Sequence, residues 1–366
     1  MTSTSTERSE HSLGIVYDHT VGFQANQGRG FNNPVDLALD SQGVMYVLNR
    51  AGPETAIRLP YKRVTICTAE EEYLGEFGTG GTGKGEFWWP SSLAFDGDGR
   101  LYVADEALQR ISVFSKEGAF LNQWGAEGNG EGQLNRPSSI AFDQENHLYV
   151  SDSLNHRVQK FTKEGRFLAV WGGPGPSSEP GRFNMPWGIA MGPDGDIHVA
   201  DWRNDRVQRF NPKGEFLGAA GEPGAATGQL NRPAGIAVDH QGNLYVADWG
   251  NERVQVFGPG WRVLADLRGD SAPSKWAQDY FDANPDEAKA RLASDLEPDV
   301  KHLGGERREE SANIEKLFWG ATAVKLDAQG HIYVVDSLRH RVQIYRWRIS
   351  GESVGPASLK TGPRIP

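Results

Sequence analysis

Short apolar segments recur along this chain, and turns containing glycine, asparagine or aspartate separate them. The repeated core starts with a proline and continues with an apolar–Ala–apolar triplet, an aspartate, a turn, and a second segment of the type Leu-Tyr-Val-Ala-Asp. Its copies begin at Pro34, Pro90, Pro137, Pro186, Pro233 and Ala321. Uninterrupted copies begin about 47 residues apart, and repeats of this length built from short strands are typical of propeller blades.

Each repeat is predicted to form four strands. The first is the apolar–Ala–apolar triplet, as at residues 93–95, and the second is the Leu-Tyr-Val-Ala segment, as at residues 244–247. Residues 253–257 alternate with the period of two that a strand requires, and residues 120–124 are the clearest fourth strand. Six repeats therefore predict an all-β fold: a six-bladed β-propeller with four-stranded blades.

We expect a single propeller domain over residues 12–347, with a disordered N-terminal tail at 1–11 and a C-terminal tail at 348–366. The segment 14–23 stands just before the first repeat, where a fourth strand belongs. It is predicted to close blade six against residues 341–345, and the alternative is closure by residues 347–350. Ring closure removes the open sheet edges that would otherwise favour aggregation.

The ends of the repeats resemble a known family. The segments that carry the resemblance are DSLNHRVQKF, DWRNDRVQRF, DWGNERVQVF and DSLRHRVQIY. They look like NHL repeats, and the resemblance covers roughly residues 30–347. It implies a propeller whose blades surround a central channel.

Two insertions interrupt the regular spacing. Residues 51–62 fall between the second and third strands of blade one, and residues 269–315 fall between blades five and six. Both are predicted to lie on one face of the ring, where the larger would form a lid over the channel mouth. The alternative is a surface insertion without function.

The larger insertion is predicted to be partly helical. Asn284 followed by Pro285 and two acidic residues is a helix start, and a second short helix is predicted over residues 311–318. Three aromatic side chains provide an apolar surface that could dock on the propeller: Trp276, Tyr280 and Phe281.

Composition and charge narrow the class of protein. The chain has 366 residues with 45 Gly, 11 Trp, 10 Tyr and 16 Phe, and this aromatic content argues against a disordered chain. Cys67 is the single cysteine, so an internal disulfide is excluded. A net charge of −10 disfavours nucleic acid as a partner. With no long apolar run and no signal segment, we expect no membrane association and a cytoplasmic location.

The second residue after each repeat start is predicted to point toward the axis. These residues are Asp36, Ser92, Ser139, Gly188, Gly235 and Ala323. Five of them are small, so the channel mouth is expected to be open, with Asp36 as its carboxylate. Asp36 is a candidate catalytic acid or base, and the alternative is a carboxylate that caps its own turn.

Several large side chains are predicted on the same face. The candidate substrate-binding residues are Trp89, Glu106, Trp187, Trp202, Arg203, Trp249 and Trp319. Such a rim of tryptophans suits an apolar or aromatic ligand. The alternative is that Trp202 and Trp249 only pack between blades.

Arg50 is the second catalytic candidate. Blade one has Asn49 where the other repeats have aspartate, so the usual acid–base pair is broken beside Arg50. The segment 46–50 resembles the first blade of peptidyl-hydroxyglycine amidating lyases and their bacterial relatives, in which a matching arginine serves the active site. Arg50 could then bind a carboxylate or polarise an oxygen. The alternative is an arginine that anchors the 51–62 insertion.

The resemblance to that lyase family stops at its zinc ligands. The lyase places histidines directly after repeat-start prolines, whereas this chain has Val35, Ser91, Ser138, Trp187, Ala234 and Thr322 there. No metal and no cofactor are therefore predicted. The repeated aspartates and the arginines five residues later are predicted to be structural ion pairs: Asp105–Arg110, Asp152–Arg157, Asp201–Arg206, Asp248–Arg253 and Asp336–Arg341. His156 and His340 beside them are expected to be exposed loop residues.

Two functions remain open from the sequence. In the first, the protein binds a small molecule at the channel mouth and acts as a metal-independent lyase, hydrolase or isomerase through Arg50 and Asp36. In the second, it is a non-catalytic scaffold that binds a protein partner. A pocket of several hundred Å³ lined by the tryptophans would favour the first, and a flat, plugged face would favour the second.

Overall fold

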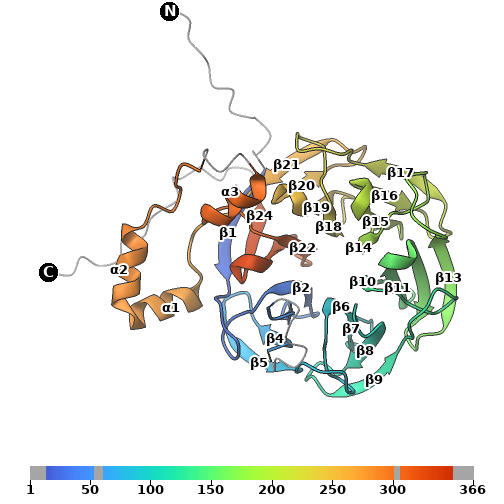
Figure 1. The fold of residues 1–366 in the computed structure, drawn as a ribbon, viewed down its shortest axis with the longest axis horizontal. Coiled ribbons are helices and arrows are strands. Elements are labelled where there is room, and N and C mark those ends of the chain that lie inside the picture. The colour runs from blue at the N-terminus through green and yellow to red at the C-terminus, as the bar shows by residue number, and fades with distance from the viewer. Residues whose placement is uncertain (1–13, 53–60, 301–305, 349–366) are drawn as a thin grey trace, which may run out of the picture.

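The computed structural model describes residues 14–52, 61–300 and 306–348. They form six four-stranded antiparallel sheets arranged around a central axis (Figure 1). The prediction of a six-bladed all-β propeller is confirmed. None of the helices in this part of the chain is long and apolar enough to cross a membrane.

The first three blades follow the chain in order, each from its inner to its outer strand. Blade one contains β2 (Pro34–Leu39), β3 (Met45–Asn49), β4 (Arg63–Cys67) and β5 (Tyr73–Phe77). Blade two contains β6 (Pro90–Phe95), β7 (Leu101–Asp105), β8 (Arg110–Phe114) and β9 (Phe120–Trp124). Blade three contains β10 (Pro137–Phe142), β11 (His147–Asp152), β12 (Arg157–Thr162) and β13 (Phe167–Gly172).

Blades four and five repeat this arrangement, and blade six combines both ends of the described chain. Blade four contains β14 (Pro186–Met191), β15 (Ile197–Asp201), β16 (Arg206–Phe210) and β17 (Phe216–Ala220). Blade five contains β18 (Pro233–Val238), β19 (Leu244–Asp248), β20 (Arg253–Phe257) and β21 (Val263–Leu267). Blade six contains β22 (Ala321–Leu326), β23 (Ile332–Asp336), β24 (Arg341–Trp347) and β1 (Ile15–Val21).

The N-terminal strand closes the ring. β1 pairs antiparallel with β24, from Ile15 opposite Trp347 to Val21 opposite Val342. The outermost strand of blade six therefore comes from the opposite end of the chain to its other three. Each pairing across this closure is long-range, so the ring closes only when the whole chain is in place.

The core lies between the blades rather than inside one of them. One buried cluster joins Leu37 and Val47 of blade one to Val335 and Ile344 of blade six, and similar clusters occupy the other junctions. Full burial of one such side chain contributes about 1.5–3 kcal/mol. In the turn of blade three, Asn146 stands where its neighbours have glycine and adopts the left-handed conformation, with φ of 65°.

The described residues between β21 and β22 form three α-helices: α1 (Lys275–Ala283), α2 (Pro285–Ala293) and α3 (Arg307–Asn313). α2 starts where the Asn284–Pro285 signal predicts. The prediction of a second helix over 311–318 is wrong in its limits. The chain after α3 leads instead into β22, and the N–H of Phe318 donates to the carbonyl of Arg268.

Trp276 docks the insertion on the side of the ring. Its ring is 4% exposed and lies edge-on to Phe31, with 5.9 Å between ring centroids. Its Nε1 donates to the carbonyl oxygen of Glu71 at 2.7 Å. The insertion thus docks on the propeller through Trp276, as predicted from this aromatic side chain, at the junction of blades six and one.

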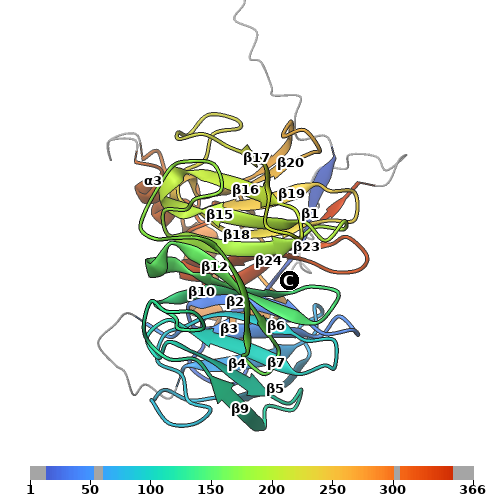
Figure 2. The same cartoon turned by 90° about the vertical axis from the view of Figure 1, so that its right-hand side faces the viewer.

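The insertion does not cover the channel as the predicted lid would. α1 and α2 lie outside the ring of blades, with α1 beside β1 and α2 next to α1 (Figure 1). α3 lies at one face of the ring, as the side view in Figure 2 shows, where Arg308 pairs with Glu252 at 2.8 Å. The apolar anchor Trp276 decides this placement, because its partners are on the outer edge of the propeller. The described part of the 51–62 insertion is limited to its ends, since residues 53–60 lie outside the described ranges.

Candidate functional site

Arg50 and Glu106 form an ion pair between blades one and two. The Nη2 atom of Arg50 lies 3.0 Å from Oε1 of Glu106, whose side chain is only 6% exposed. The Nε of Arg50 donates to the carbonyl of Pro90, and its guanidinium lies 5.0 Å from the ring centroid of Trp89. Burial raises the pKa of Glu106, and the charge of Arg50 opposes that rise.

Asn49 removes the repeated aspartate–arginine pair from blade one. The uncharged Asn49 amide donates to Thr65 and to the carbonyl of Val47. Arg63, which stands where the other blades have the paired arginine, binds Glu76 at 2.7 Å instead. The broken pair predicted at blade one is confirmed, and the carboxylate that Arg50 binds belongs to the protein itself.

A small cavity, here called the axial cavity, lies where the inner strands meet. Its volume is about 70 Å³, and its lining includes Asp36, Arg50, Trp187 and Lys325. That volume is far below the several hundred Å³ typical of an enclosed ligand pocket. It could hold a carboxylate or carbonyl group but not a whole organic ligand.

Asp36 is fully hydrogen-bonded within the axial cavity. Its Oδ1 accepts from the N–H of Leu37 at 2.9 Å and pairs with Lys325 at 3.1 Å. Its Oδ2 accepts from the hydroxyl of Ser92 at 2.7 Å and from the N–H of Leu93 at 3.1 Å. A carboxylate offers about four acceptor positions, so all of them are used. Asp36 therefore joins blades one, two and six, and a proton from a substrate would have to displace one of these donors.

Lys325 is the axial residue that the sequence analysis missed. The other five repeats have alanine at this place in the inner strand: Ala38, Ala94, Ala141, Ala190 and Ala237. Only blade six places a long cation there, and its side chain is 26% exposed. A position-by-position comparison of the repeats would have found it.

Three of the predicted tryptophans form a continuous row on the face of blades four and five. The centroids of Trp187 and Trp202 are 5.9 Å apart, and those of Trp202 and Trp249 are 6.5 Å apart. All three rings are half-buried. Because Trp187 also lines the axial cavity, this tryptophan row continues directly from it.

Three arginines lie close to two rings of the tryptophan row. Arg203 and Arg232 lie 5.7 Å and 5.0 Å from the centroid of Trp202, and Arg308 lies 4.7 Å from that of Trp249. All three arginine residues are exposed. An aromatic strip with exposed guanidinium groups suits a ligand that carries negative charge or carbonyl oxygens.

The remaining predicted tryptophans are not in this row. Trp89 lies under Arg50 and Lys62, beside the Arg50–Glu106 pair. Trp319 lies under Arg339, with 5.8 Å between the guanidinium carbon and the ring centroid. The tryptophans therefore form separate groups rather than one rim.

Four of the five predicted structural ion pairs are formed. The Nε–Oδ2 distances are 2.7–2.9 Å for Asp152–Arg157, Asp201–Arg206, Asp248–Arg253 and Asp336–Arg341. The fifth is not formed: Asp105 accepts from the backbone N–H groups of Trp88 and Trp89, while Arg110 donates to the carbonyls of Gly83 and Glu86.

His156 and His340 are not exposed loop residues, contrary to the prediction. Each is partly buried and adopts the left-handed conformation. The Nδ1 of His156 accepts from the N–H of Met185, and that of His340 accepts from the N–H of Asn33. Each imidazole thus joins its blade to the next, and burial lowers the pKa of both.

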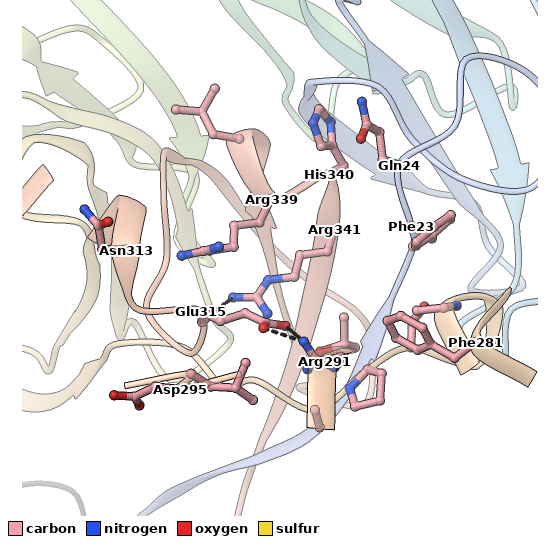
Figure 3. Close-up of a pocket in the computed structure, with 18 residues that line it drawn as sticks. Phe23, Gln24, Phe281, Arg291, Asp295, Asn313, Glu315, Arg339, His340 and Arg341 are labelled. Atoms are coloured by element: carbon pink, nitrogen blue, oxygen red, sulfur yellow. Dashed lines mark hydrogen bonds and ion pairs between the residues drawn. The ribbon is translucent and has the colours of Figure 1, made fainter. Parts of the chain in front are cut away.

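A second cavity, of about 470 Å³, lies between the insertion and blade six (Figure 3). Arg291 from α2 points into it and pairs with Glu315. Arg341 donates to Asp336 and to the carbonyl of Glu315, while Arg339 donates to the carbonyl of Ser311. These guanidinium groups hold the insertion to blade six, so the cavity belongs to that joint and not to the channel.

One group of side chains within the described ranges has the spacing of a possible metal site: Asp143, Glu145 and His147. Asp143 already pairs with Lys160 at 2.9 Å and accepts two backbone N–H groups of its own turn. The group spans the turn after β10 and the first residue of β11, and none of its members lines the axial cavity.

Comparison with known proteins identifies the repeats. The NHL repeat family matches residues 134–161, 183–210, 230–257 and 318–345, which correspond to blades three to six. The resemblance read from the sequence is thus confirmed for the repeats. Among the curated proteins, none matches the chain.

Solved structures with the same fold are only distantly related in sequence. A streptogramin B lyase structure has a TM-score of 0.54 at 11% identity, covering 93% of this chain and 100% of that one. A catalytically inactive virginiamycin B lyase from Staphylococcus aureus with quinupristin has a TM-score of 0.52 at 12% identity, covering 91% and 99%. A structural genomics protein of unknown function from Bacteroides thetaiotaomicron has a TM-score of 0.58 at 15% identity, covering 92% and 76%. These similarities establish the fold.

Proposed function

We propose that this NHL-repeat propeller binds a small molecule on the face that carries Arg50 and the tryptophan row. The ligand has an aromatic or apolar body and an anionic or carbonyl oxygen. The observation that carries this proposal is the double position of Trp187, which lines the axial cavity and begins the tryptophan row.

Two cations in the axial cavity have donors to spare. Arg50 uses its Nε and Nη2 on Pro90 and Glu106, and no hydrogen bond of its Nη1 is recorded in the described structure. Lys325 has three N–H bonds, and one of them is directed at Asp36. The axial cavity of about 70 Å³ would accept the oxygen end of the ligand, while its body lies on the tryptophan row outside.

We further propose that any catalysis at this face is of the lyase, hydrolase or isomerase type and needs no metal. Arg50 and Lys325 would stabilise negative charge that develops on the bound oxygen. Lys325 is a better candidate for a catalytic residue than Asp36, because the four acceptor positions of Asp36 are occupied. Elimination is the first reaction to assay, since lyases are among the proteins that share the fold.

The second candidate function is a scaffold for a protein partner. The small volume of the axial cavity favours it, as does the exposure of Arg203, Arg232 and Arg308 along the tryptophan row. Such a partner would present acidic and aromatic side chains to this strip. It would bind without requiring Lys325, which lies inside the axial cavity.

Titration with naphthalene-2-carboxylate, compared with 2-methylnaphthalene, which lacks both oxygens, tests the proposal by calorimetry. We expect the carboxylate to bind about tenfold more tightly, a difference of about 1.4 kcal/mol. Lys325→Met should remove that preference, whereas Lys213→Met, at an exposed lysine outside the site, should keep it. Equal binding of both probes to the wild-type protein, or a preference that survives Lys325→Met, would contradict the proposal.

A further inference from the structure

Blade four departs from the repeat at a pair of positions that interact in other blades. The tyrosine of the second strand is replaced by His198, whereas the other blades have Tyr46, Tyr102, Tyr149, Tyr245 and Tyr333. The aspartate that follows the first strand is replaced by Gly192, whereas the other blades have Asp40, Asp96, Asp143, Asp239 and Asp327. Both changes remove side-chain volume at the same place.

The residue facing this place from blade five is also small. At the last position of the inner strand the six blades have Leu39, Phe95, Phe142, Met191, Val238 and Leu326, and Val238 is the smallest. In two other junctions the tyrosine packs edge-on against this residue, with 4.8 Å from Tyr46 to Phe95 and 4.9 Å from Tyr102 to Phe142. The junction between blades four and five lacks that aromatic contact.

A cavity of about 400 Å³ opens at this junction. Its lining includes Gly192, His198, Val238, Leu217 and Trp261. It lies at the turns between first and second strands, which are at the opposite ends of the strands from Arg50 and Trp202. It is therefore on the other face of the ring from the site proposed above.

His198 is the polar group that this cavity leaves without a partner. The residue is 4% exposed, its Nδ1 is buried without a hydrogen-bond partner, and its Nε2 forms no hydrogen bond with other residues in the described ranges. Burial lowers the pKa of His198 to about 4, so the imidazole is neutral at pH 7. Its Nε2 lies 3.4 Å from the place where a Cβ would stand at Gly192, so the missing side chain is what opens that edge of the ring. A ligand that hydrogen-bonds to this imidazole would supply a partner that the fold itself does not provide.

The other blades indicate the chemistry of that ligand. There the tyrosine hydroxyl donates to the aspartate, as Tyr245 does to Asp239 at 3.0 Å and Tyr333 to Asp327 at 3.1 Å. Blade four lacks both the tyrosine ring and the aspartate that accepts its hydrogen bond. The neutral imidazole of His198 can accept a hydrogen bond from a hydroxyl group in place of that aspartate. Trp261 stands edge-on to His198, with 6.3 Å between centroids, and provides an aromatic wall.

We propose that the cavity between blades four and five binds a small neutral aromatic compound with a hydroxyl group, of the phenol class. Its ring occupies the volume of the missing tyrosine and phenylalanine side chains, and its hydroxyl donates to His198. A negatively charged ligand is disfavoured there, because Arg209 on the cavity wall is already neutralised by Asp196 at 2.5 Å. This site is independent of the function proposed for the opposite face.

The experiment is titration of the full chain with 4-methylphenol, with toluene as the probe that lacks the hydroxyl, followed by ligand-observed NMR. We expect saturable binding of 4-methylphenol and at least about tenfold weaker binding of toluene. The double variant Gly192→Asp/His198→Tyr restores the pair found in the other blades and should abolish binding. Lys325→Met, in the axial cavity, should leave it unchanged.

A second variant guards against misfolding of the first. Val238→Phe places in blade five the side chain found at Phe95 and Phe142, and it should also abolish binding while the melting temperature stays at or above that of the wild type. The proposal is overturned if 4-methylphenol fails to bind at about 10 mM, or if either folded variant binds it as the wild type does.

Discussion

Arg50 on blade one and Glu106 on blade two are joined by an ion pair of 3.0 Å, although 56 positions separate them in the chain. Both residues occupy the same place in their repeats, directly after the position of the repeated aspartate. This ion pair therefore distinguishes the junction between blades one and two in a ring that is otherwise built from repeated contacts. It also decides how much of the charge of Arg50 is free for a ligand.

Arg50→Met should destabilise the protein by about 2–3 kcal/mol at pH 8, because it leaves the Glu106 carboxylate buried without its partner. Burial already raises the pKa of Glu106, and removal of Arg50 raises it further. Because the pKa of Glu106 is higher in the folded protein than in the unfolded chain, the folded protein loses stability as the pH rises above the unfolded pKa. The destabilisation by Arg50→Met should therefore be smaller at pH 5 than at pH 8. Urea unfolding at both pH values measures it. Arg50→Met/Glu106→Gln should show little of this pH dependence, and an equal loss at both pH values would refute the explanation.

Trp276→Ala should release the insertion from the ring. The change removes a buried ring and its hydrogen bond to Glu71, and such truncations cost about 3–5 kcal/mol locally. Limited proteolysis should then cut the segment around α1 and α2 while the blades stay intact. Leu292→Ala is the matched control, because Leu292 lies on α2 and is 88% exposed. Unchanged proteolysis of the Trp276 variant would show that other contacts hold the insertion.

Removal of residues 1–21 should make the protein aggregate. Without β1, the strand β24 becomes an open edge with unpaired N–H and C=O groups, which is a template for pairing between molecules. Removal of residues 1–13 leaves β1 in place and serves as the control. Light scattering during thermal unfolding distinguishes the two, and a monomeric product from the longer deletion would contradict the closure argument.

His198 should make the protein less stable as the pH falls from 6.5 to 4. In the unfolded chain the imidazole of His198 takes up a proton at about pH 6.5, whereas in the folded protein it stays neutral until about pH 4. The free energy of unfolding should therefore fall by about 3 kcal/mol more in the wild type than in His198→Tyr. His240→Gln changes an exposed histidine on the wall of the same cavity and should behave as the wild type. Parallel pH profiles of wild type and His198→Tyr would disprove the shifted pKa.

The predictions that the structure confirms concern features set by residues that are close together in the chain. The strands, the turn at Asn146, the start of α2 and the uncharged Asn49 beside Arg50 all depend on neighbouring residues, and the structure bears them out. The predicted lid, the fifth ion pair at Asp105 and the exposed histidines are wrong. Each of these depends on contacts between segments that are remote in the chain or on the geometry of the loops between blades.

The sequence alone determined the number of blades and the order of strands within each, because alternation, turns and repeat length are local properties that recur six times. A position-by-position comparison of the repeats also shows that Lys325, Gly192 and His198 differ from the residues of the other blades. The tertiary structure decided what these departures do. Asp36 meets Lys325, and Trp276 meets Phe31, only after ring closure sets the angle between blades. Such meetings depend on distances between remote segments, which no local pattern encodes.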